Sequence, residues 1–139
     1  MFLLDTNVLS ALVAVDLAPA LVAWMTGTPE RFLHTATICQ AELLAGIAIL
    51  PAGRRRENLE IATHAMLEQN FAGRIWPFDS VSAIAYAKIF SLRPRAGRHV
   101  DSPDLMIAAI AHSHRASVVT RNVGDFENCG VTIINPWSE

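Results

Sequence analysis

The sequence contains little of what several protein classes require. Lysine is almost absent, because ten of the eleven basic residues are arginine and only Lys88 is lysine. Thirteen acidic residues against eleven basic ones give a net charge of −2, which excludes a protein that coats nucleic acid through bulk positive charge. Charged residues make up only 17% of the chain and hydrophobic residues 52%, which excludes intrinsic disorder. The 139 residues therefore predict one compact domain over 1–139.

Cysteine and long hydrophobic runs are also scarce. Cys39 and Cys129 form no C-x-x-C motif, so zinc-ribbon, haem-attachment and thioredoxin sites lack support, and we expect a reduced pair of thiols. The longest apolar stretch near the N-terminus runs from Val8 to Val15, far below the ~20 residues of a membrane span, and it has no basic flank. We therefore expect a cytoplasmic protein with no export signal and no membrane partner.

Short apolar runs alternate with stretches of helical periodicity along the whole chain. We expect strands at 2–4, 31–35, 74–78, 116–120 and 131–134, and helices at about 8–13, 19–25, 37–48, 54–69, 80–91 and 103–111. Ser102 and Pro103 predict the start of the last helix, as its cap and first residue. This alternation favours an α/β fold with a parallel sheet of about five short strands between layers of helices.

Polar and acidic residues follow two of these strands. Asp5, Thr6 and Asn7 come directly after the first, and Thr120, Asn122 and Asp125 after the fourth. The carboxyl ends of parallel strands share one edge of the sheet, where ligands bind in such folds. Asp104 opens the helix that leads into the fourth strand, and Glu42 lies within an apolar helix. The four carboxylates of Asp5, Glu42, Asp104 and Asp125 are therefore expected to converge.

Neighbouring carboxylates repel one another, and a divalent cation removes that penalty. A set of carboxylates without histidine or thiolate ligands favours Mg²⁺, with Mn²⁺ as a substitute, and such sites activate water for attack on phosphorus. The leading prediction is hydrolysis of phosphodiester bonds.

Each acid also has a purely structural interpretation. Asp5 can cap the following helix, Asp104 can favour a helix dipole, Asp125 can serve a turn, and Glu42 can belong to an exposed stripe. For the arginines at 54–56, a solvated helix start and an anion site both stay open. A metal shared by His112 and His114 is disfavoured, because residues two apart diverge on a helix.

Four segments together resemble the PIN-domain family in order and spacing. They are FLLDTNVLSAL at 2–12, AELLAGI at 41–47, DLMIAAIA at 104–111 and VVTRNVGDF at 118–126. The resemblance is to VapC-type toxin ribonucleases, and FAGRIWPFD at 71–79 and INPW at 134–137 are similar to the FitB-like branch. It implies a three-layer α/β/α domain, a Mg²⁺-dependent endoribonuclease, a homodimer, and a cognate antitoxin that neutralises it and connects it indirectly to operator DNA.

The resemblance also implies roles for individual residues. Asp5, Glu42 and Asp104 match three acids of the family, whereas the fourth position falls on either Asn122 or Asp125. Asp5 and Asp104 would bind Mg²⁺, Asp125 or Asn122 would assist, and Glu42 would orient or deprotonate the attacking water. The expected supporting residues are Thr6, Asn7, Thr120, Arg121 and Asn122, with Arg121 holding phosphate oxygens. Asp101 competes with Asp104, and the loop at 93–101 is expected to influence the choice of RNA.

Two other functions remain open at this point. A Mg²⁺-dependent phosphatase with an aspartyl nucleophile requires a second aspartate where this chain has Asn7, and an active-site lysine. A catalytically weak PIN module could instead act mainly as a dimeric antitoxin-binding partner in a DNA-bound complex, and the neutral Asn122 favours that alternative. The apolar faces at 8–25 and 38–69 are candidates for a partner groove.

Overall fold

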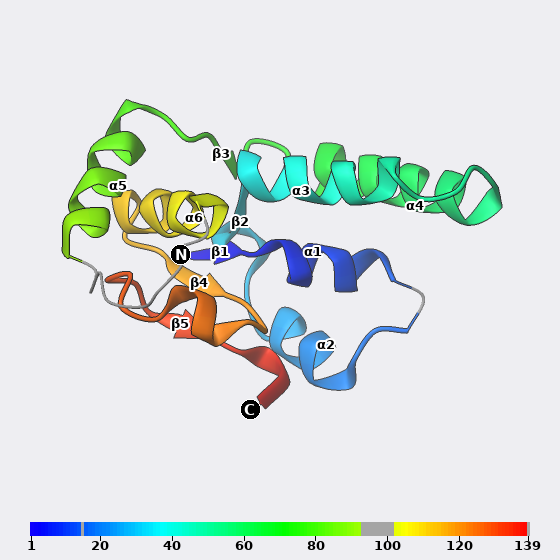
Figure 1. Ribbon diagram of the computed structural model, residues 1–139. Coiled ribbons are helices and arrows are strands. Elements are labelled where there is room, and N and C mark those ends of the chain that lie inside the picture. The colour runs from blue at the N-terminus through cyan, green and yellow to red at the C-terminus, as the bar shows by residue number, and fades with distance from the viewer. Residues whose placement is uncertain (15, 93–101, 139) are drawn as a thin grey trace.

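The computed structural model describes residues 1–14, 16–92 and 102–138 and places a parallel sheet at its centre (Figure 1). The sheet order is β3-β2-β1-β4-β5, and every strand pair in it is parallel. The strands are β1 (Phe2–Leu4), β2 (Leu33–Ala36), β3 (Ile75–Trp76), β4 (Ser117–Val119) and β5 (Ile133–Ile134). All five predicted strands are confirmed, at or near the expected positions.

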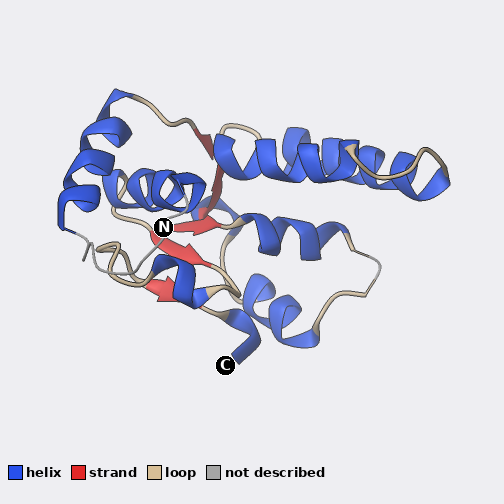
Figure 2. Cartoon of the chain, in the orientation of Figure 1, coloured by secondary structure: helices blue, strands red, loops and turns tan. Residues whose placement is uncertain are grey.

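Six α-helices and four short helical turns connect the strands (Figure 2). The helices are α1 (Thr6–Val13), α2 (Pro19–Thr26), α3 (Thr37–Ala48), α4 (Arg54–Ala65), α5 (Ser80–Leu92) and α6 (Ser102–Ser113). The turns are η1 (Glu30–Phe32), η2 (Met66–Asn70), η3 (Val123–Phe126) and η4 (Pro136–Ser138). In Figure 1, α6 lies on one side of the sheet and α2 on the other, and the α3–α4 hairpin projects away from it. The three-layer α/β/α fold is confirmed.

The strand order creates a switch point between β1 and β4. From β1 the chain moves to β2 on one side, whereas from β4 it moves to β5 on the other. Connections that leave in opposite directions open a crevice at the carboxyl ends of the two strands, and ligands of α/β proteins bind in such crevices. The residues that follow β1 and β4 are Asp5 and Thr120, so the fold brings both predicted polar corners to this crevice.

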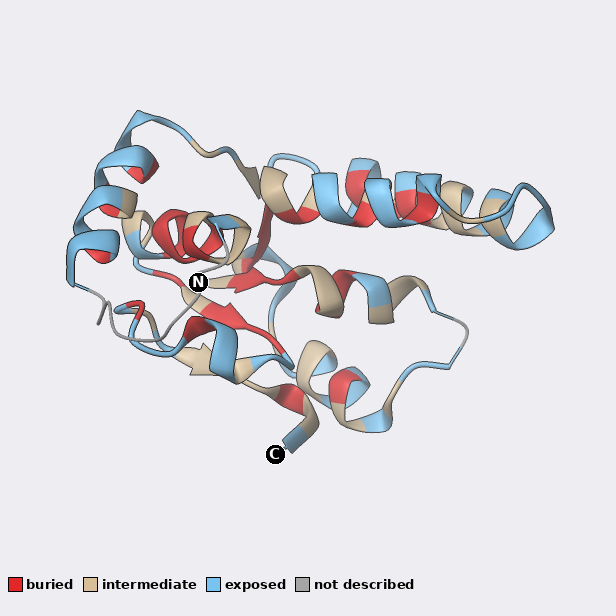
Figure 3. Cartoon of the chain, in the orientation of Figure 1, coloured by how far each residue is buried: buried red, intermediate tan, exposed pale blue. Residues whose placement is uncertain are grey.

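The core is built from the two central strands and α6. Leu3, Leu4, Val118 and Val119 are fully buried, and α6 is buried on nearly its whole circumference from Leu105 to Ala111 (Figure 3). Burial of an aliphatic side chain of this size contributes about 1.5–3 kcal/mol each. The core therefore fixes α6, and with it Asp104, relative to β1 and β4.

Two helix ends differ from the sequence-based expectation. Ser102 is the first residue of α6 and not the cap before it. The helix expected over 54–69 ends as a π turn, in which the Phe71 amide donates to the carbonyl oxygen of Met66 at 3.1 Å. The wider turn directs Met66, Leu67 and Phe71 into the core, which explains why the α-helical pattern stops early. Asp101 and the loop at 93–99 lie outside the described residues.

The tryptophans pack within the domain, as their irregular spacing indicates. The rings of Phe2 and Trp24 meet edge to face at 5.2 Å. Trp76 lies between His34 and His114, with both ring centroids 4.0 Å from the indole. Both faces of this indole are therefore covered and cannot stack on a base.

In the described part of the chain, no helix is both long and apolar enough to cross a membrane.

One polar group in the core is unusual. The Thr63 hydroxyl on α4 is fully buried, and its oxygen has no hydrogen-bond partner among the described residues.

Thr63→Val replaces this hydroxyl with a methyl group of similar size. A buried hydroxyl without a partner costs about 1–3 kcal/mol, so we expect the melting temperature to rise by about 3 °C for each kcal/mol recovered. Thermal unfolding followed by circular dichroism measures the change. Thr63→Ser keeps the hydroxyl and loses a methyl group, so it should lower the melting temperature, and a decrease in both variants would contradict the assignment.

Candidate metal-dependent active site

Asp5 stands at the switch point and is held there by three donors. Its Oδ1 accepts the Thr6 amide at 2.8 Å, and Asp5 is thereby the N-cap of α1. Its Oδ2 accepts the Thr120 hydroxyl at 2.8 Å and the Asn7 side-chain amide at 2.9 Å. The capping role and the proposed site role are therefore compatible, because the capping bond uses one carboxylate oxygen and the strand junction uses the other.

Asn7 joins the two polar corners. Its Nδ2 also donates to the Thr120 hydroxyl at 3.0 Å, and its Oδ1 accepts the Arg121 amide at 3.0 Å. The Thr120 oxygen in turn accepts the amide of Asn122 at 3.0 Å. The supporting residues predicted after β1 and β4 thus form one connected network, and the sequence did not indicate that Asn7 is the bridge.

Glu42 reaches this network from α3. Its Oε1 accepts the Thr6 hydroxyl at 2.7 Å, although the side chain as a whole is exposed. Its Oε2 receives no hydrogen bond from the described residues. The exposure of Glu42 agrees with the exposed-stripe interpretation, and its functional role stays a prediction, since Thr6 fixes only one of its two oxygens.

Asp104 and Asp125 are carried by α6 and η3, which pack against each other. Asp104 is half-buried in the first turn of α6. Helix α6 packs against α3, which carries Glu42, and against η3, which carries the exposed Asp125. Because only residues 114–116 separate α6 from β4, the helix runs back along the sheet and begins near the carboxyl ends of the strands.

The electrostatics of Asp5 reflect this arrangement. Burial raises the pKa of Asp5 above its ordinary value, and the carboxylates of Glu42 and Asp125 raise the pKa further, whereas the bonds from Thr120 and Thr6 lower it. Asp125 is thus close enough to interact with Asp5. Asn122 is neutral and contributes its backbone amide to the network.

The donor chemistry fits a hard divalent cation, because every candidate ligand is a carboxylate or hydroxyl oxygen. A cation would also offset the repulsion and burial that raise the pKa of Asp5. Among the described residues, no three His, Cys, Asp or Glu side chains lie in a ready metal-ligating arrangement. The carboxylates of Glu42 and Asp125 are close enough to influence Asp5, but they do not meet it around a common point.

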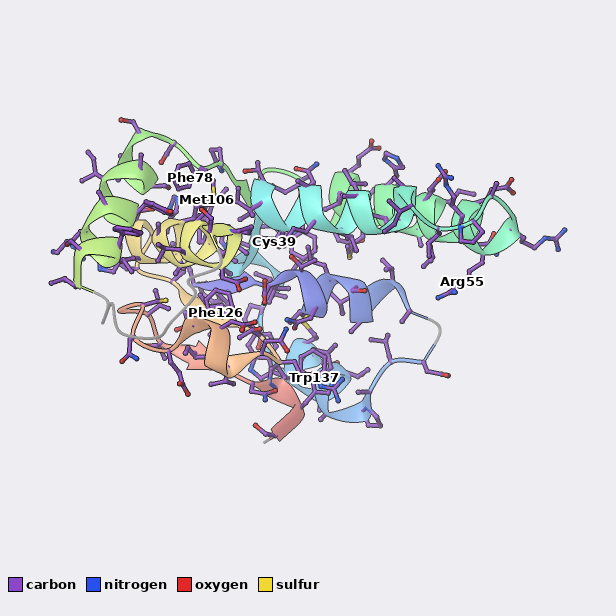
Figure 4. All side chains as sticks on the ribbon, in the orientation of Figure 1. Cys39, Arg55, Phe78, Met106, Phe126 and Trp137 are labelled. Atoms are coloured by element: carbon purple, nitrogen blue, oxygen red, sulfur yellow. The ribbon has the colours of Figure 1, made fainter. Side chains whose placement is uncertain are left out.

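Cys39 lies beneath the site and was not singled out by its sequence context. It is fully buried near the start of α3, next to the ends of β1 and β2 (Figure 4). Burial raises the pKa of its thiol to about 12, the nearby Asp5 adds to this increase, and interactions with Thr35 and Thr6 partly offset it. Cys39 and Cys129 are both buried, and neither is part of a disulfide.

Comparison with known proteins assigns the chain to a family. The family model of the PIN domain matches residues 2–129, a span that contains both polar corners and all four candidate acids. The chain therefore belongs to the PIN-domain family.

Within this family, three curated relatives are similar over their full lengths. The plasmid stability protein StbB of Pseudomonas syringae pv. tomato is 38% identical over 137 residues, which is 99% of each chain. The VapC ribonuclease Y4jK of Sinorhizobium fredii is 36% identical over 137 residues, covering 99% of this chain and 98% of the relative. The toxin FitB of Neisseria gonorrhoeae is 37% identical over 143 residues, and both chains are covered completely.

A solved structure of FitAB bound to an IR36 DNA fragment contains a similar chain. The TM-score is 0.89 at 35% sequence identity, with 99% of this chain and 96% of that chain covered. The expected resemblance to VapC-type and FitB-like proteins is thus confirmed.

Asp5→Asn tests the electrostatics of the site without metal. Because the pKa of Asp5 is raised, folding favours its protonated form, so stability falls as pH rises from 3.8 through the folded-state pKa. Asparagine removes this dependence, although changed hydrogen bonds add an offset that does not vary with pH. We expect the melting temperature of the variant minus that of the wild type, both in EDTA, to increase between about pH 4 and pH 8. A difference that stays constant with pH would contradict the raised pKa.

Proposed function

We propose that this protein is a Mg²⁺-dependent endoribonuclease and the toxin of a toxin–antitoxin pair, acting in the cytoplasm. The observation that carries the proposal is the position of Asp5 at the β1–β4 switch point, where burial raises its pKa and the carboxylates of Glu42 and Asp125 add to the increase. Carboxylates carried by several elements around such a crevice are suited to a divalent cation and to attack on a phosphodiester. The full-length similarity to a VapC ribonuclease and to the toxin FitB supports RNA as the substrate.

The acids divide between two roles. Asp5, Asp104 and Asp125 would hold Mg²⁺, or Mn²⁺ in its place, and the ion would supply Lewis-acid stabilisation of charge on the attacked phosphate. We assign the fourth position to Asp125 and not to Asn122, because Asp125 carries a charge that acts on Asp5. Thr120 and Asn7 orient Asp5 through hydrogen bonds to its Oδ2.

Glu42 positions and deprotonates the attacking water. Thr6 fixes its Oε1 and leaves Oε2 free to accept a proton from water in the crevice. The neighbouring Arg121 lies with its guanidinium 5.4 Å from the centre of the Trp137 ring, which holds the cation beside the β4 corner. Arg121 would bind phosphate oxygens from there.

The proposed partners are a cognate antitoxin and, through it, operator DNA. A cavity of about 530 Å³ lies between α1, α2 and α4, and its apolar lining includes Leu12, Val13, Met25 and Met66. An amphipathic segment of a protein partner binds in grooves of this kind. The structural similarity to FitAB bound to a DNA fragment supports an assembly that includes DNA.

A homodimer is the proposed oligomeric state. Helix α5 exposes Val81, Ile84 and Leu92, which are 60%, 71% and 74% accessible and follow one another at helical spacing. A stripe of exposed aliphatic side chains is typical of an interaction surface. We propose that α5 contributes to the contact between two copies of the chain.

Cleavage of a pooled RNA substrate by antitoxin-free protein tests the activity. We expect cleavage in Mg²⁺ that is lost in EDTA, and a decrease of more than about 100-fold for Asp5→Asn, because loss of a ligand should exceed the 10–100-fold typical of outer-shell partners. Thr120→Val removes one bond that orients Asp5 and should fall within that 10–100-fold range.

Glu127→Gln serves as the matched control, because it neutralises an exposed carboxylate two residues beyond Asp125. This variant should cleave at the wild-type rate. Equal activity of Asp5→Asn and Glu127→Gln would refute the assigned site. No cleavage by folded wild-type protein in Mg²⁺ would favour the alternative of a non-catalytic, antitoxin-binding module.

The proposed dimer contact predicts the effect of a single charge on α5. Ile84→Asp places a carboxylate in the apolar stripe, and the desolvation cost should convert the dimer to a monomer. Ile61→Asp is the control, since Ile61 is 70% exposed on α4 and Ile84 is 71% exposed. Size-exclusion chromatography with light scattering measures the mass. A dimeric Ile84→Asp variant would exclude α5 from the interface.

A further inference from the structure

A second and larger groove leads away from the carboxylate site. It has a volume of about 1050 Å³ and runs between α1 on one wall and the α3–α4 hairpin on the other. Thr6 and Glu42 line it where it meets the site, and Arg54, Arg55 and Asn58 line it along the start of α4. The groove therefore joins the proposed catalytic carboxylates to a pair of arginines.

The two arginines are available for a ligand. Arg56, the third residue of the run, is engaged, because its guanidinium bonds to Glu60 at 2.8 Å and to the Leu50 carbonyl at 3.4 Å. Arg54 and Arg55 are exposed and form no ion pair or hydrogen bond within the described part of the chain. Figure 4 shows Arg55 near the free end of the hairpin.

The position of these charges is unfavourable for the helix itself. Cations near a helix N-terminus oppose the helix dipole, and no side chain caps α4 at Gly53. Arg54 and Arg55 therefore raise the positive potential at this end of the groove without an evident gain in local stability. Guanidinium groups bind phosphate oxygens in bidentate fashion, so an anionic backbone complements this wall.

The floor of the groove favours an extended chain over stacked bases. No aromatic ring is among its described lining residues, so base stacking contributes little. A Cβ added to Gly46 would meet nothing within 4 Å, so the floor midway along α3 is open. Asp16 on the α1 side repels phosphates and directs an anionic chain toward the arginines.

We infer that this groove holds the single-stranded RNA that flanks the attacked phosphodiester, and that Arg54 and Arg55 bind its backbone phosphates. The inference rests on the proposed ribonuclease function. Glu42 lies on α3, and Leu50 follows it by eight residues, just beyond the end of that helix. This spacing corresponds to about 12 Å along the helix axis. Helix α4, which carries the two arginines, begins after the turn that follows Leu50. The arginines thus contact phosphates that lie several nucleotides from the cleavage site and contribute to affinity without taking part in the chemistry.

Binding of a fluorescein-labelled 12-nucleotide RNA pool to antitoxin-free protein in EDTA tests this assignment. Fluorescence anisotropy at several salt concentrations gives the affinity and its salt dependence. The logarithm of the binding constant falls linearly with the logarithm of the salt concentration, by about 0.7 for each phosphate contact on a single strand. The double variant Arg54→Ala with Arg55→Ala loses two contacts, so its slope should be less steep by about 1.4. The affinity should fall about tenfold in low salt.

The matched control is Arg31→Ala with Arg115→Ala. Both arginines are exposed and precede strands, so they lie at the opposite end of the sheet, and their removal changes the net charge by the same amount. This double variant should bind RNA as the wild type does. Melting curves of both double variants verify that they are folded.

Gly46 offers a second test that leaves the arginines intact. Gly46→Glu places a negative charge on the open floor of the groove, and Gly46→Gln has the same shape without the charge. Both substitutions increase helix propensity, so folding should not suffer. The glutamate variant should bind RNA more weakly than the glutamine variant, whereas equal affinities would place the RNA elsewhere.

The outcomes separate this inference from the proposed function. If wild-type protein binds and cleaves RNA but the Arg54 and Arg55 variant matches its control in affinity and slope, the groove assignment is wrong and the ribonuclease proposal stands. The arginines would then be candidates for contacts with acidic side chains of a protein partner. If wild-type protein neither binds nor cleaves RNA, both proposals fail.

Discussion

The parallel pairing of β1 with β4 is the constraint on which the site depends. Leu4 and Val119 are opposed in register, so the next residues, Asp5 and Thr120, meet at the carboxyl end of the sheet. The Asp5 amide continues the ladder by donating to the Val119 carbonyl at 2.9 Å. Side-chain hydrogen bonds from Thr120 and Asn7 continue beyond this ladder. They hold the Asp5 carboxylate in a buried position, where desolvation disfavours its charged form. Without this register, Asp5 would be only the cap of a helix.

Much of the fold could be predicted because its signals are local. Each strand is a short apolar run, and α3 and α6 have apolar periodicity that their burial confirms. The errors fall where tertiary packing decides the local geometry. The π turn at Met66–Asn70 brings Phe71 into the core. The helical periodicity of the sequence does not predict this change of geometry, because it depends on tertiary packing.

The site could be predicted only as a set of residues. The positions of Asp5 and Thr120 after strands indicated a shared edge, but the hydrogen bonds of Asn7 depend on a side-chain orientation that spacing does not encode. Glu42 illustrates the same limit, since its exposure and its bond to Thr6 arise from the angle between α1 and α3. The position of Cys39 beneath the site could not be predicted, because its complete burial depends on the tertiary packing of the folded chain.

The proposed function requires negative charge to bind a cation and positive charge to bind an anionic chain, within one small domain of net charge −2. The buried Asp5, whose pKa the Glu42 and Asp125 carboxylates help to raise, lies at the switch point, whereas Arg54 and Arg55 line the far end of the neighbouring groove. An even mixture of charges would give neither a strong cation site nor a positive surface. Separation along one continuous groove keeps the two kinds of charge apart, so a weakly acidic protein can still present a positive surface.

The central position of β1 has a consequence for biosynthesis. This strand is synthesised before the other four, and its neighbour β4 and the η3 turn follow more than a hundred residues later. Asp5 therefore meets Thr120 and Asp125 only after more than a hundred further residues have been translated. Nascent chains that have not yet reached β4 contain Asp5 and Glu42 but lack Thr120, which donates a hydrogen bond to Asp5. Assembly of the site therefore comes after synthesis of the η3 turn, so a chain that ends before β4 would lack the ordered Asp5 corner.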